Sequence, residues 1–328
     1  MNFWQKLPKP FFVLAPMDGV TDTVFRQIVA SVGRPDVFFT EFVPVEAIQS
    51  KAQEKVLDQA LRYSESERPI VAQIWGKDPE KFYKTAKLLS KLGFDGIDIN
   101  MGCPDRSVIK QGSCSALIKN PKLAQEIILA TIKGAGDLPV SVKTRIGFSS
   151  IDIENWVTIL LSTPIAVLTL HLRTVAEMSK VPAHWDEVEK TVKIRNELKS
   201  EALIIGNGGI KSLSQAKKMC EKYKIDGVMI GTGIFENVYM FNESVDPETV
   251  TPKQKIQLLL KHLRLFEKIW GEKRHFELMK KFVKCYVNNF DRAAEYRVEL
   301  MKTKTLPDLI SAVTSLNAKD YVPGGHRQ

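Results

Sequence analysis

Three polar side chains stand where an apolar stretch of the sequence ends, and each is of a type that can do chemistry. Cys103 comes after GIDINMG, Lys143 after PVSV, and His171 after AVLTL. A thiol can act as a nucleophile or as a general acid, with a pKa set by its surroundings. A lysine can form a Schiff base or supply a fixed cation beside an anionic cofactor ring. Each residue also has a structural interpretation: packing for Cys103, an ion pair for Lys143, and a hydrogen-bonded core position for His171.

Gln73 and two glycine-rich segments are candidates for binding a ligand. The Gln73 amide both donates and accepts hydrogen bonds, which suits the edge of a flat heterocycle or a buried hydrogen bond inside the protein. The segments GNGGI (206–210) and GTGI (231–234) each follow an apolar run. Because glycine lacks a Cβ, backbone N–H groups there can approach an anion closely. We therefore expect a phosphorylated ligand, with tight turns as the alternative.

The elements that would position these residues alternate regularly through residue 235. Short apolar runs rich in Val, Ile and Phe alternate with amphipathic, helix-like segments. The runs are apolar on both faces, as in parallel strands that helices cover. We assign eight strands, at residues 11–17, 37–42, 69–75, 96–102, 139–146, 166–172, 202–207 and 227–231. Eight strand–helix alternations predict an α/β fold of the (β/α)8 TIM-barrel type rather than an open, doubly wound sheet.

A barrel of this type carries its active residues at the carboxyl ends of its strands and in the loops that follow. The assigned strands would bring one polar set to the same mouth, made up of Met17, Asp18, Glu41, Gln73, Asn100, Cys103, Lys143, Arg145, His171, Arg173, Asn207 and the segment 231–233. The two glycine segments would follow strands seven and eight, where many barrels bind phosphate. No group of His, Cys and carboxylate residues has the spacing of zinc ligands, so we predict no metal site.

The pattern changes near residue 251, after which no strand-like run occurs. The spacing of apolar residues predicts helices at 253–270, 274–289 and 306–316. Pro247 and Pro252 bracket a linker. We therefore divide the chain into a barrel domain at residues 1–246 and a small helical domain at residues 247–328, with a frayed tail at 324–328.

The excess of basic residues is concentrated in that helical domain. The whole chain carries a formal net charge of +9, of which residues 251–328 contribute +8, with 16 basic and 8 acidic residues. Such an asymmetry indicates a surface that binds a polyanion, with a solvated helical face as the alternative.

The composition excludes several other classes of protein. With 44% hydrophobic and 26% charged residues, the chain is not disordered as a whole. No apolar run approaches the roughly 18 residues that a membrane span needs. The four cysteines form no CxxC pair and no disulfide framework. We expect a cytoplasmic monomer that binds neither a membrane nor a metal ion.

Six segments, taken in order along the chain, carry a resemblance to a known family. They are APMDGVTD (15–22), VAQIWG (71–76), GIDINMGCPDRSVIKQGS (96–113), VKTRIG (142–147), HLRT (171–174) and GNGGI (206–210). In this order they resemble the bacterial-type, FMN-dependent tRNA-dihydrouridine synthases, and the likeness covers the barrel from about residue 11 to 235. The basic helical tail also resembles that family's RNA-binding domain. The motif NxGCPxxxV, here Asn100 to Val108, is specific, whereas APMxGVTD is shared with other flavin barrels.

The resemblance implies an oxidoreductase that uses FMN and NADPH to reduce specific uridines in tRNA to 5,6-dihydrouridine. Reduced FMN would deliver hydride from its N5 to uracil C6, and Cys103 would deliver the proton to C5. That role requires a protonated thiol, so a pocket that favours the thiolate would work against it. By motif position, the residues implied to bind FMN are Pro16, Met17, Asp18, Gln73, Lys143, His171, Asn207, Gly208, Gly209, Gly231 and Thr232. The candidates for binding uracil or the RNA backbone are Asn100, Arg145, Arg173, Lys280, Lys281, Lys284, Arg292 and Arg297.

The chain departs from the family pattern at three positions. Gly209 stands where the family usually has Asp, Thr232 where it has Arg, and Leu172 where it has Gly. Loss of an arginine near the phosphate removes a charge-assisted contact, although the Thr232 hydroxyl can still donate a hydrogen bond.

The residues alone are also compatible with three other functions. They are an FMN-barrel oxidoreductase for a small molecule, a catalytically decayed tRNA-binding protein, and an aldolase that forms a Schiff base on Lys143. The basic tail favours tRNA over a small molecule as the substrate, because a small molecule gives such a tail no role.

Overall fold

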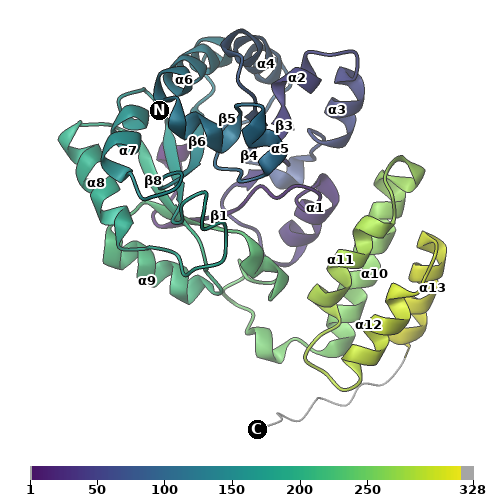
Figure 1. The fold of residues 1–328 in the computed structure, drawn as a ribbon. Helices are drawn as coiled ribbons and strands as arrows, with labels where there is room; N and C mark the ends of the chain where they lie inside the picture. Colours follow the sequence, from purple (N-terminus) through teal and green to yellow (C-terminus); the bar gives the residue numbers. More distant parts are fainter. Residues whose placement is uncertain (1, 319–328) are drawn as a thin grey trace. The chain divides into compact units, whose positions relative to one another are not determined.

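A ring of parallel strands surrounded by helices makes up most of the computed structural model, which describes residues 2–318 (Figure 1). The predicted tail at 324–328 lies outside the described residues. The strands are β1 (Phe11–Leu14), β2 (Phe38–Phe39), β3 (Val43–Pro44), β4 (Ile70–Trp75), β5 (Gly96–Met101), β6 (Val140–Arg145), β7 (Val167–His171), β8 (Leu203–Asn207) and β9 (Gly227–Ile230). Their order is β1-β9-β8-β7-β6-β5-β4-β2, with β3 also paired to β4. A parallel bridge between Val13 and Val37 brings the two ends of this order together. The predicted TIM barrel is confirmed.

The predicted strand at 37–42 is shorter in the structure, and a second short strand follows just after it. β2 covers only Phe38 and Phe39, and the pairing with β4 resumes in β3. Between these two strands, the Gln73 N–H donates to the Thr40 hydroxyl at 3.1 Å. A side-chain hydrogen bond therefore replaces one backbone rung of the ladder. The predicted strand therefore ends early, at Phe39, and the next short strand, β3, begins just beyond residue 42.

Helices fill the connections between the strands. They are α1 (Thr23–Val32), α2 (Val45–Ile48), α3 (Gln53–Gln59), α4 (Pro79–Lys91), α5 (Arg106–Lys110), α6 (Pro121–Ala135), α7 (Ile153–Leu161), α8 (Glu187–Glu197) and α9 (Leu213–Tyr223). Short 3-10 helices occur as η1 (Phe3–Lys6), η2 (Glu65–Glu67), η3 (Cys114–Lys119), η4 (Thr232–Phe235), η5 (Pro247–Thr249) and η6 (Gly271–Lys273). In α4, the Asp78 carboxylate caps the first turn by accepting from the N–H groups of Glu80 and Lys81. Apolar residues of α4 at helical spacing, Phe82, Ala86 and Leu89, are fully buried.

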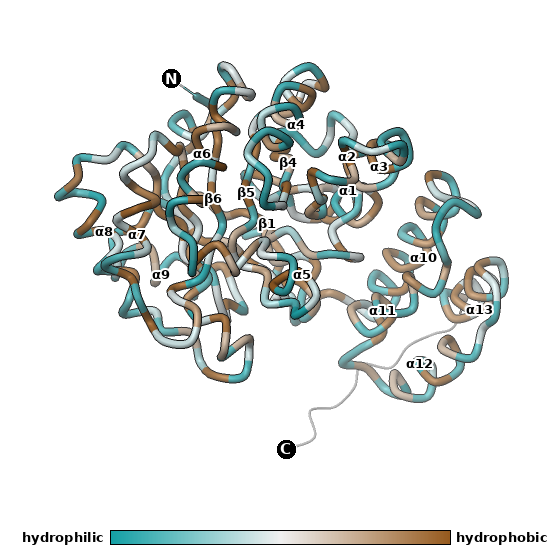
Figure 2. The backbone as a smooth tube through the Cα atoms, turned by 45° about the horizontal axis from the view of Figure 1, so that its top comes forward, coloured by the Kyte–Doolittle hydropathy of each residue, from teal (hydrophilic) through white to brown (hydrophobic). Residues whose placement is uncertain are grey.

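Many residues of the strands are hydrophobic (Figure 2), for example in β1, β8 and β9. An apolar cluster contains Trp4, Phe11, Val13, Ala15, Val37, Phe39, Val71, Val167, Leu203, Ile205 and Met229. Trp4, from η1, packs with its ring centroid 5.8 Å from that of Phe11 and 6.2 Å from that of Phe39. Because Phe11 begins its strand, η1 covers the amino-terminal end of the barrel. The carboxyl ends of the strands are left for polar residues.

Within the described residues, the chain after residue 251 forms four α-helices, α10 (Pro252–Ile269), α11 (Glu277–Tyr286), α12 (Ala293–Met301) and α13 (Leu306–Asn317). Helices α10 and α13 confirm the predictions at 253–270 and 306–316, and α11 lies within the predicted segment 274–289. Helix α12 lies outside the three helices that the apolar spacing predicts. None of the helices within residues 2–318 combines the length and the apolar character that crossing a membrane requires.

Contacts divide the chain into two units. The first unit holds the chain up to Thr23 together with Pro35–Gly231, and the second holds Val24–Arg34 together with the chain from Thr232 onward. Phe25 of α1 therefore belongs with the terminal helices, and its ring stacks on that of Phe282 at 4.9 Å. The predicted boundary between residues 246 and 247 stays a prediction.

Candidate active site

The strand register sets most of the predicted polar residues side by side at the carboxyl ends of the strands. Because residues two apart in a strand project from the same face, Asp98 and Asn100 share one face of β5, and Lys143 and Arg145 share one face of β6. Going round the barrel, the register pairs Gln73 with Asp98, Asn100 with Lys143, Arg145 with His171, and His171 with Asn207.

The loop that carries Cys103 is held by hydrogen bonds from three sides. Asn100 Oδ1 accepts from the backbone N–H groups of Gly102 and Cys103, both at 3.0 Å. The Ser115 hydroxyl donates to the Cys103 carbonyl at 2.7 Å, and Arg145 Nε donates to the Gly102 carbonyl at 2.8 Å. These bonds fix the backbone around a half-buried thiol.

Cys114, to which the sequence analysis assigns no role, has the largest influence on the Cys103 thiol. A hydrogen bond from the Cys114 thiol lowers the pKa of Cys103 to about 7, and partial burial opposes this shift. Burial raises the pKa of Cys114 well above its ordinary value. Near pH 7, Cys103 is therefore present as thiol and thiolate in comparable amounts, which differs from the expectation of a site that keeps it fully protonated. A pKa close to the working pH is nevertheless the best value for a general acid.

Gln73 uses both ends of its amide inside the protein. Its Nε2 donates to Asp98 Oδ2 at 2.7 Å, and its Oε1 accepts from Asn100 Nδ2 at 3.0 Å. The Ser141 hydroxyl donates to the other oxygen of Asp98 at 2.5 Å. Burial raises the pKa of Asp98 to about 6, while these hydrogen bonds and the Lys143 charge oppose the rise. Above that pH the Asp98 carboxylate can only accept hydrogen bonds, so the NH2 group of Gln73 must face it and the Gln73 oxygen must face Asn100. Asn100 therefore presents its NH2 group to Gln73 and its Oδ1 to the Cys103 loop.

Lys143 brings a half-buried cation to the site. Within residues 2–318, its ammonium makes no hydrogen bond and no ion pair. Burial lowers the pKa of Lys143 to about 8, the charge of Arg145 lowers it further, and Asp98 opposes both effects. The group is mainly protonated at pH 7, with three N–H donors that the described chain does not use.

His171 is held as a neutral imidazole. Arg173 Nη1 lies 2.9 Å from His171 Nε2. Because a guanidinium can only donate, Nε2 accepts and the ring proton lies on Nδ1. Burial, followed by the charges of Lys143, Arg145 and Arg173, lowers the pKa of His171 to about 2. The ring therefore offers one N–H donor and no positive charge at physiological pH.

Arg145 connects the loops on either side of it. Besides its bond to Gly102, its Nη1 donates to the carbonyls of Thr174 at 2.9 Å and Met178 at 2.7 Å. Only 4% of the residue is exposed. Arg145 thus joins the Cys103 loop to the loop after β7, and its predicted contact with uracil or RNA stays a prediction.

The glycine segment after β8 lies against the Arg173 guanidinium. Gly208 and Gly209 have φ angles of +134° and +70°, which residues with a Cβ rarely adopt. A Cβ on Gly208 would come within 3.4 Å of Arg173 Nη1, and one on Gly209 would lie 3.8 Å from Arg173 Nη2. Asn207 Nδ2 donates to the Met229 carbonyl at 2.8 Å. At this strand end, a phosphate group could therefore approach the glycine backbone closely and contact the Arg173 guanidinium as well.

The remaining residues predicted to bind FMN lie in the loops after β1 and β9. Pro16 is buried, Met17 is half-buried and Asp18 is exposed. Gly231 directly follows β9, and Thr232 begins η4 in the second unit. The roles of these five residues stay predictions. Among the residues that the structure describes, no three His, Cys, Asp or Glu side chains gather as metal ligands.

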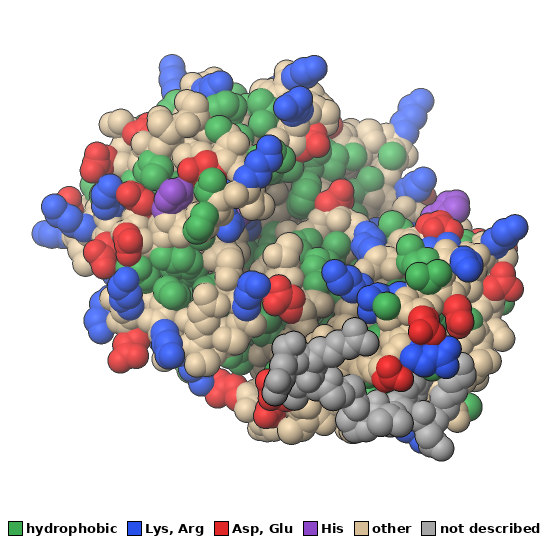
Figure 3. Space-filling view, turned by 60° about the horizontal axis from the view of Figure 1, so that its bottom comes forward, with side chains coloured by type: hydrophobic (Ala, Val, Ile, Leu, Met, Phe, Trp, Pro, Cys, Tyr) green, Lys and Arg blue, Asp and Glu red, His purple; other side chains and the backbone are tan. Residues whose placement is uncertain are grey.

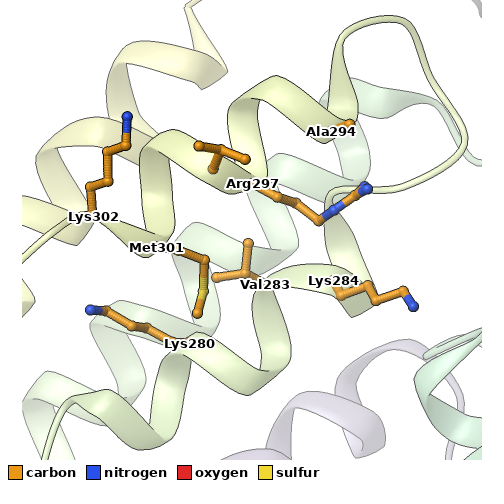
Figure 4. Close-up of a pocket in the computed structure, with 8 residues that line it drawn as sticks. Lys280, Val283, Lys284, Ala294, Arg297, Met301 and Lys302 are labelled. Carbon is orange, nitrogen blue, oxygen red and sulfur yellow. The ribbon is translucent and has the colours of Figure 1, made fainter.

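Three of the predicted RNA-binding residues surround one pocket of the terminal helices. Figure 4 shows Lys280, Lys284 and Arg297 around Val283 and Met301. The Lys280 ammonium is already bound to Glu277 Oε1 at 2.9 Å and to the Thr303 carbonyl at 2.7 Å. Arg297 Nη1 donates to the Val287 carbonyl at 2.8 Å, whereas the Lys284 ammonium has no hydrogen bond or ion pair within residues 2–318.

Lys281 and Arg292 do not line this pocket. Lys281 lies over the Phe282 ring at 5.8 Å, and Arg292 pairs with Glu295 at 2.8 Å. Lysine and arginine side chains also project widely over the face seen in Figure 3, interspersed with acidic ones.

Sequence reasoning missed several basic residues of the terminal helices. Lys302 joins the pocket of Figure 4, and its ammonium has no partner among the described residues. Lys261, Arg264 and Lys268 line a second concavity on α10. Their spacing of three and four residues puts them on one helical face, and this spacing is a signal that could have found them.

A parallel barrel with a braced cysteine, a lysine and a neutral histidine at the ends of its strands defines a (β/α)8-barrel enzyme. The model of the family described as dihydrouridine synthase matches residues 13–319. The chain therefore belongs to the dihydrouridine synthase family, a family of flavin-dependent reductases, as the six sequence segments predict.

Relatives and solved structures agree with this assignment. The chain is 44% identical over 320 residues to a probable tRNA-dihydrouridine synthase of Staphylococcus aureus (strain COL), covering 97% of this chain and 96% of that protein. It is 43% identical over 325 residues to the probable tRNA-dihydrouridine synthase 2 of Bacillus subtilis (strain 168), covering 98% of both. Morphinone reductase superposes with a TM-score of 0.54 at 13% identity, over 74% of this chain and 88% of that one. At that identity, the likeness shows a shared barrel fold.

Proposed function

We propose that this enzyme reduces specific uridines of tRNA to 5,6-dihydrouridine, with FMN as its cofactor and NADPH as its reductant. The observation that carries the proposal is the Cys103 thiol, which is braced and has a near-neutral pKa, together with the Lys143 ammonium at a neighbouring strand end, which has no partner within residues 2–318. Membership of the dihydrouridine synthase family supports the reaction, and the names of the relatives supply tRNA as the substrate.

The residues present fit FMN on two observations. The Lys143 ammonium has three donors that the described part of the chain does not use, which suits the anionic edge of a reduced flavin ring. The glycines after β8, next to the Arg173 guanidinium, suit the phosphate. The residues that we propose to hold the cofactor are Pro16, Met17, Asp18, Gln73, Lys143, His171, Asn207, Gly208, Gly209, Gly231 and Thr232. When bound and reduced, the flavin supplies the hydride for uracil C6.

Lys143 and His171 act on the cofactor by charge and orientation. Lys143 balances negative charge on the ring, and its pKa of about 8 keeps it mainly protonated at neutral pH. His171 stays neutral and donates from Nδ1, because Arg173 occupies its Nε2. A positive ring nitrogen next to three other cations would cost free energy, so the neutral form is the one that the site maintains.

Cys103 holds the proton that uracil C5 receives. General acid catalysis of this kind contributes about 10²- to 10⁴-fold to a rate. The bonds from Asn100, Ser115 and Arg145 keep the loop in place while the thiol gives up its proton. Asn100 and Arg145 have a positioning role through these bonds, in addition to their predicted contact with the substrate.

The basic residues of the second unit bind the tRNA backbone in this proposal. Lys284 and Lys302 are the cations of the pocket in Figure 4 whose ammonium groups are unused within residues 2–318. Contacts of lysine with phosphate supply affinity without reading the sequence. Because tRNA is the substrate and the four cysteines are free, we propose that the enzyme works in the reducing cytoplasm, as a monomer.

The test uses the purified protein with an unmodified tRNA transcript and NADPH. We expect a yellow protein that releases FMN on heating, and a gain of two hydrogen atoms at one or a few uridines by mass spectrometry. A transcript already carrying dihydrouridine serves as the control. A colourless protein, or one that consumes NADPH only with small unsaturated molecules, would contradict the proposal.

A further inference from the structure

A second cysteine lies against the proposed proton donor. The Cys114 thiol is the group that most lowers the pKa of Cys103, and η3, which begins at Cys114, packs against β5, whose end precedes Cys103. The next residue along the chain, Ser115, binds the Cys103 carbonyl at 2.7 Å. Side-chain and backbone contacts together therefore hold the start of η3 against the Cys103 loop.

The two sulfurs differ in access to solvent. Cys103 is half-buried, whereas Cys114 is fully buried. Cys114 reaches its position through a left-handed backbone conformation, with φ of +52°, just after Gly112 at +77°. A buried thiol therefore lies next to a partly exposed one, which is the arrangement of a reactive cysteine and its resolving partner.

We propose that Cys103 and Cys114 form a reversible disulfide when the enzyme meets a hydroperoxide, and that this modification switches the enzyme off. The loss of activity rests on the proposed role of Cys103 as proton donor, whereas formation of the disulfide does not. The bond would also protect Cys103 from irreversible oxidation to a sulfinic acid.

The chemistry needs only the peroxide as oxidant. The Cys103 thiolate attacks one peroxide oxygen, the O–O bond breaks, and the departing hydroxide takes a proton to leave as water. Cys103 is then a sulfenic acid. The Cys114 sulfur attacks the Cys103 sulfur, the S–O bond breaks, and the hydroxyl leaves as a second water with the Cys114 proton. Two thiols are oxidised to one disulfide and one hydrogen peroxide is reduced to two waters.

The other two cysteines are poorly suited to this reaction. Cys220 and Cys285 are buried, and burial raises the pKa of each to about 12. They remain thiols at neutral pH and react slowly with peroxide, because the thiolate is the nucleophile. Oxidation is therefore directed to Cys103.

The test treats the purified holoenzyme with hydrogen peroxide, blocks the remaining thiols, and maps tryptic peptides. Cleavage after Arg106 and Lys110 puts the two cysteines on separate peptides, so the disulfide is detected as a linked pair. Wild-type enzyme should lose activity, show the linked pair, and recover with dithiothreitol. Cys114→Ser keeps a hydrogen-bond donor beside Cys103 but cannot form the bond, so its recovered fraction should be about tenfold smaller.

Cys220→Ala is the matched control, and it should behave as wild type does. Absence of the linked peptide in the oxidised wild type would overturn the proposal, as would full recovery of Cys114→Ser. A linked peptide in an enzyme that keeps its activity would leave the disulfide standing but refute both the switch and the role of Cys103 as proton donor.

Discussion

The pKa of Cys103 depends on one neighbouring thiol, Cys114, more than on its own burial. The sequence predicts Cys103, Lys143 and Gln73 as site residues because their types suit the chemistry. It could not predict the hydrogen-bond partners of these residues, because the strand register or the fold of a distant loop determines which side chains meet. Gln73 finds its partners on the neighbouring strand, for example, and Asp98 could have been suspected only from its position two residues before Asn100.

The first prediction concerns the pH dependence of proton donation. The acid must be a thiol, so kcat/KM for uridine reduction should fall as the pH rises above about 7, the pKa of Cys103. Cys114→Ala removes the hydrogen bond that stabilises the thiolate but leaves Cys103 partly buried. The pKa of Cys103 should then rise, and the falling limb should move to higher pH by about one unit or more.

Cys114→Ser provides the check on this shift, because a serine hydroxyl can still donate to the Cys103 sulfur. Its pH profile should stay closer to that of the wild type than the profile of Cys114→Ala does. Identical profiles for wild type and Cys114→Ala would show that Cys114 does not tune the thiol.

Secondary-structure elements were easier to predict than side-chain partners. The barrel strands can be identified as apolar runs that end in polar residues, because parallel strands covered by helices are hydrophobic on both faces. The early end of the strand predicted at 37–42 escaped prediction because it depends on a hydrogen bond from the Gln73 N–H to the Thr40 hydroxyl. The approach of Arg173 to Gly208 and Gly209 likewise requires the loop after β7 to fold back toward β8.

The second prediction tests that approach. Arg173→Gln should weaken FMN binding by about 10- to 100-fold, because a charge-assisted hydrogen bond to the phosphate is lost. Riboflavin, which has the same ring but no phosphate, should bind both proteins equally. Isothermal titration of the apoprotein with each ligand measures the difference. An equal loss for the two ligands would mean that Arg173 supports the ring site through His171 instead.

At the scale of the whole molecule, charge is distributed unevenly between the parts of the chain. Residues 251–328 hold +8 of the net +9, and this asymmetry is visible in the sequence. Which lysines are available is not visible there, because Lys280 is engaged with Glu277 and Thr303 while Lys284 and Lys302 are unused within residues 2–318. The grouping of Val24–Arg34 with the terminal helices also depends on contacts between segments far apart in the sequence.

The third prediction follows from the two unused lysines. The double variant Lys284→Ala/Lys302→Ala should weaken tRNA binding and reduce the slope of log affinity against log salt concentration by roughly one to two. Lys122→Ala/Lys133→Ala on α6 removes the same charge and serves as the control. Equal salt slopes for both double variants would assign the effect to net charge rather than to the pocket of Figure 4.

Measuring the two half-reactions of Cys103→Ala separately tests whether Cys103 is the proton donor. We expect this variant to bind FMN, and we expect NADPH to bleach its flavin absorbance at the wild-type rate. Transfer from the reduced enzyme to tRNA, followed by rapid quench and mass spectrometry, should be slower by about 10²- to 10⁴-fold. Uridine reduction at the wild-type rate would contradict the account, because the proton would then come from another group.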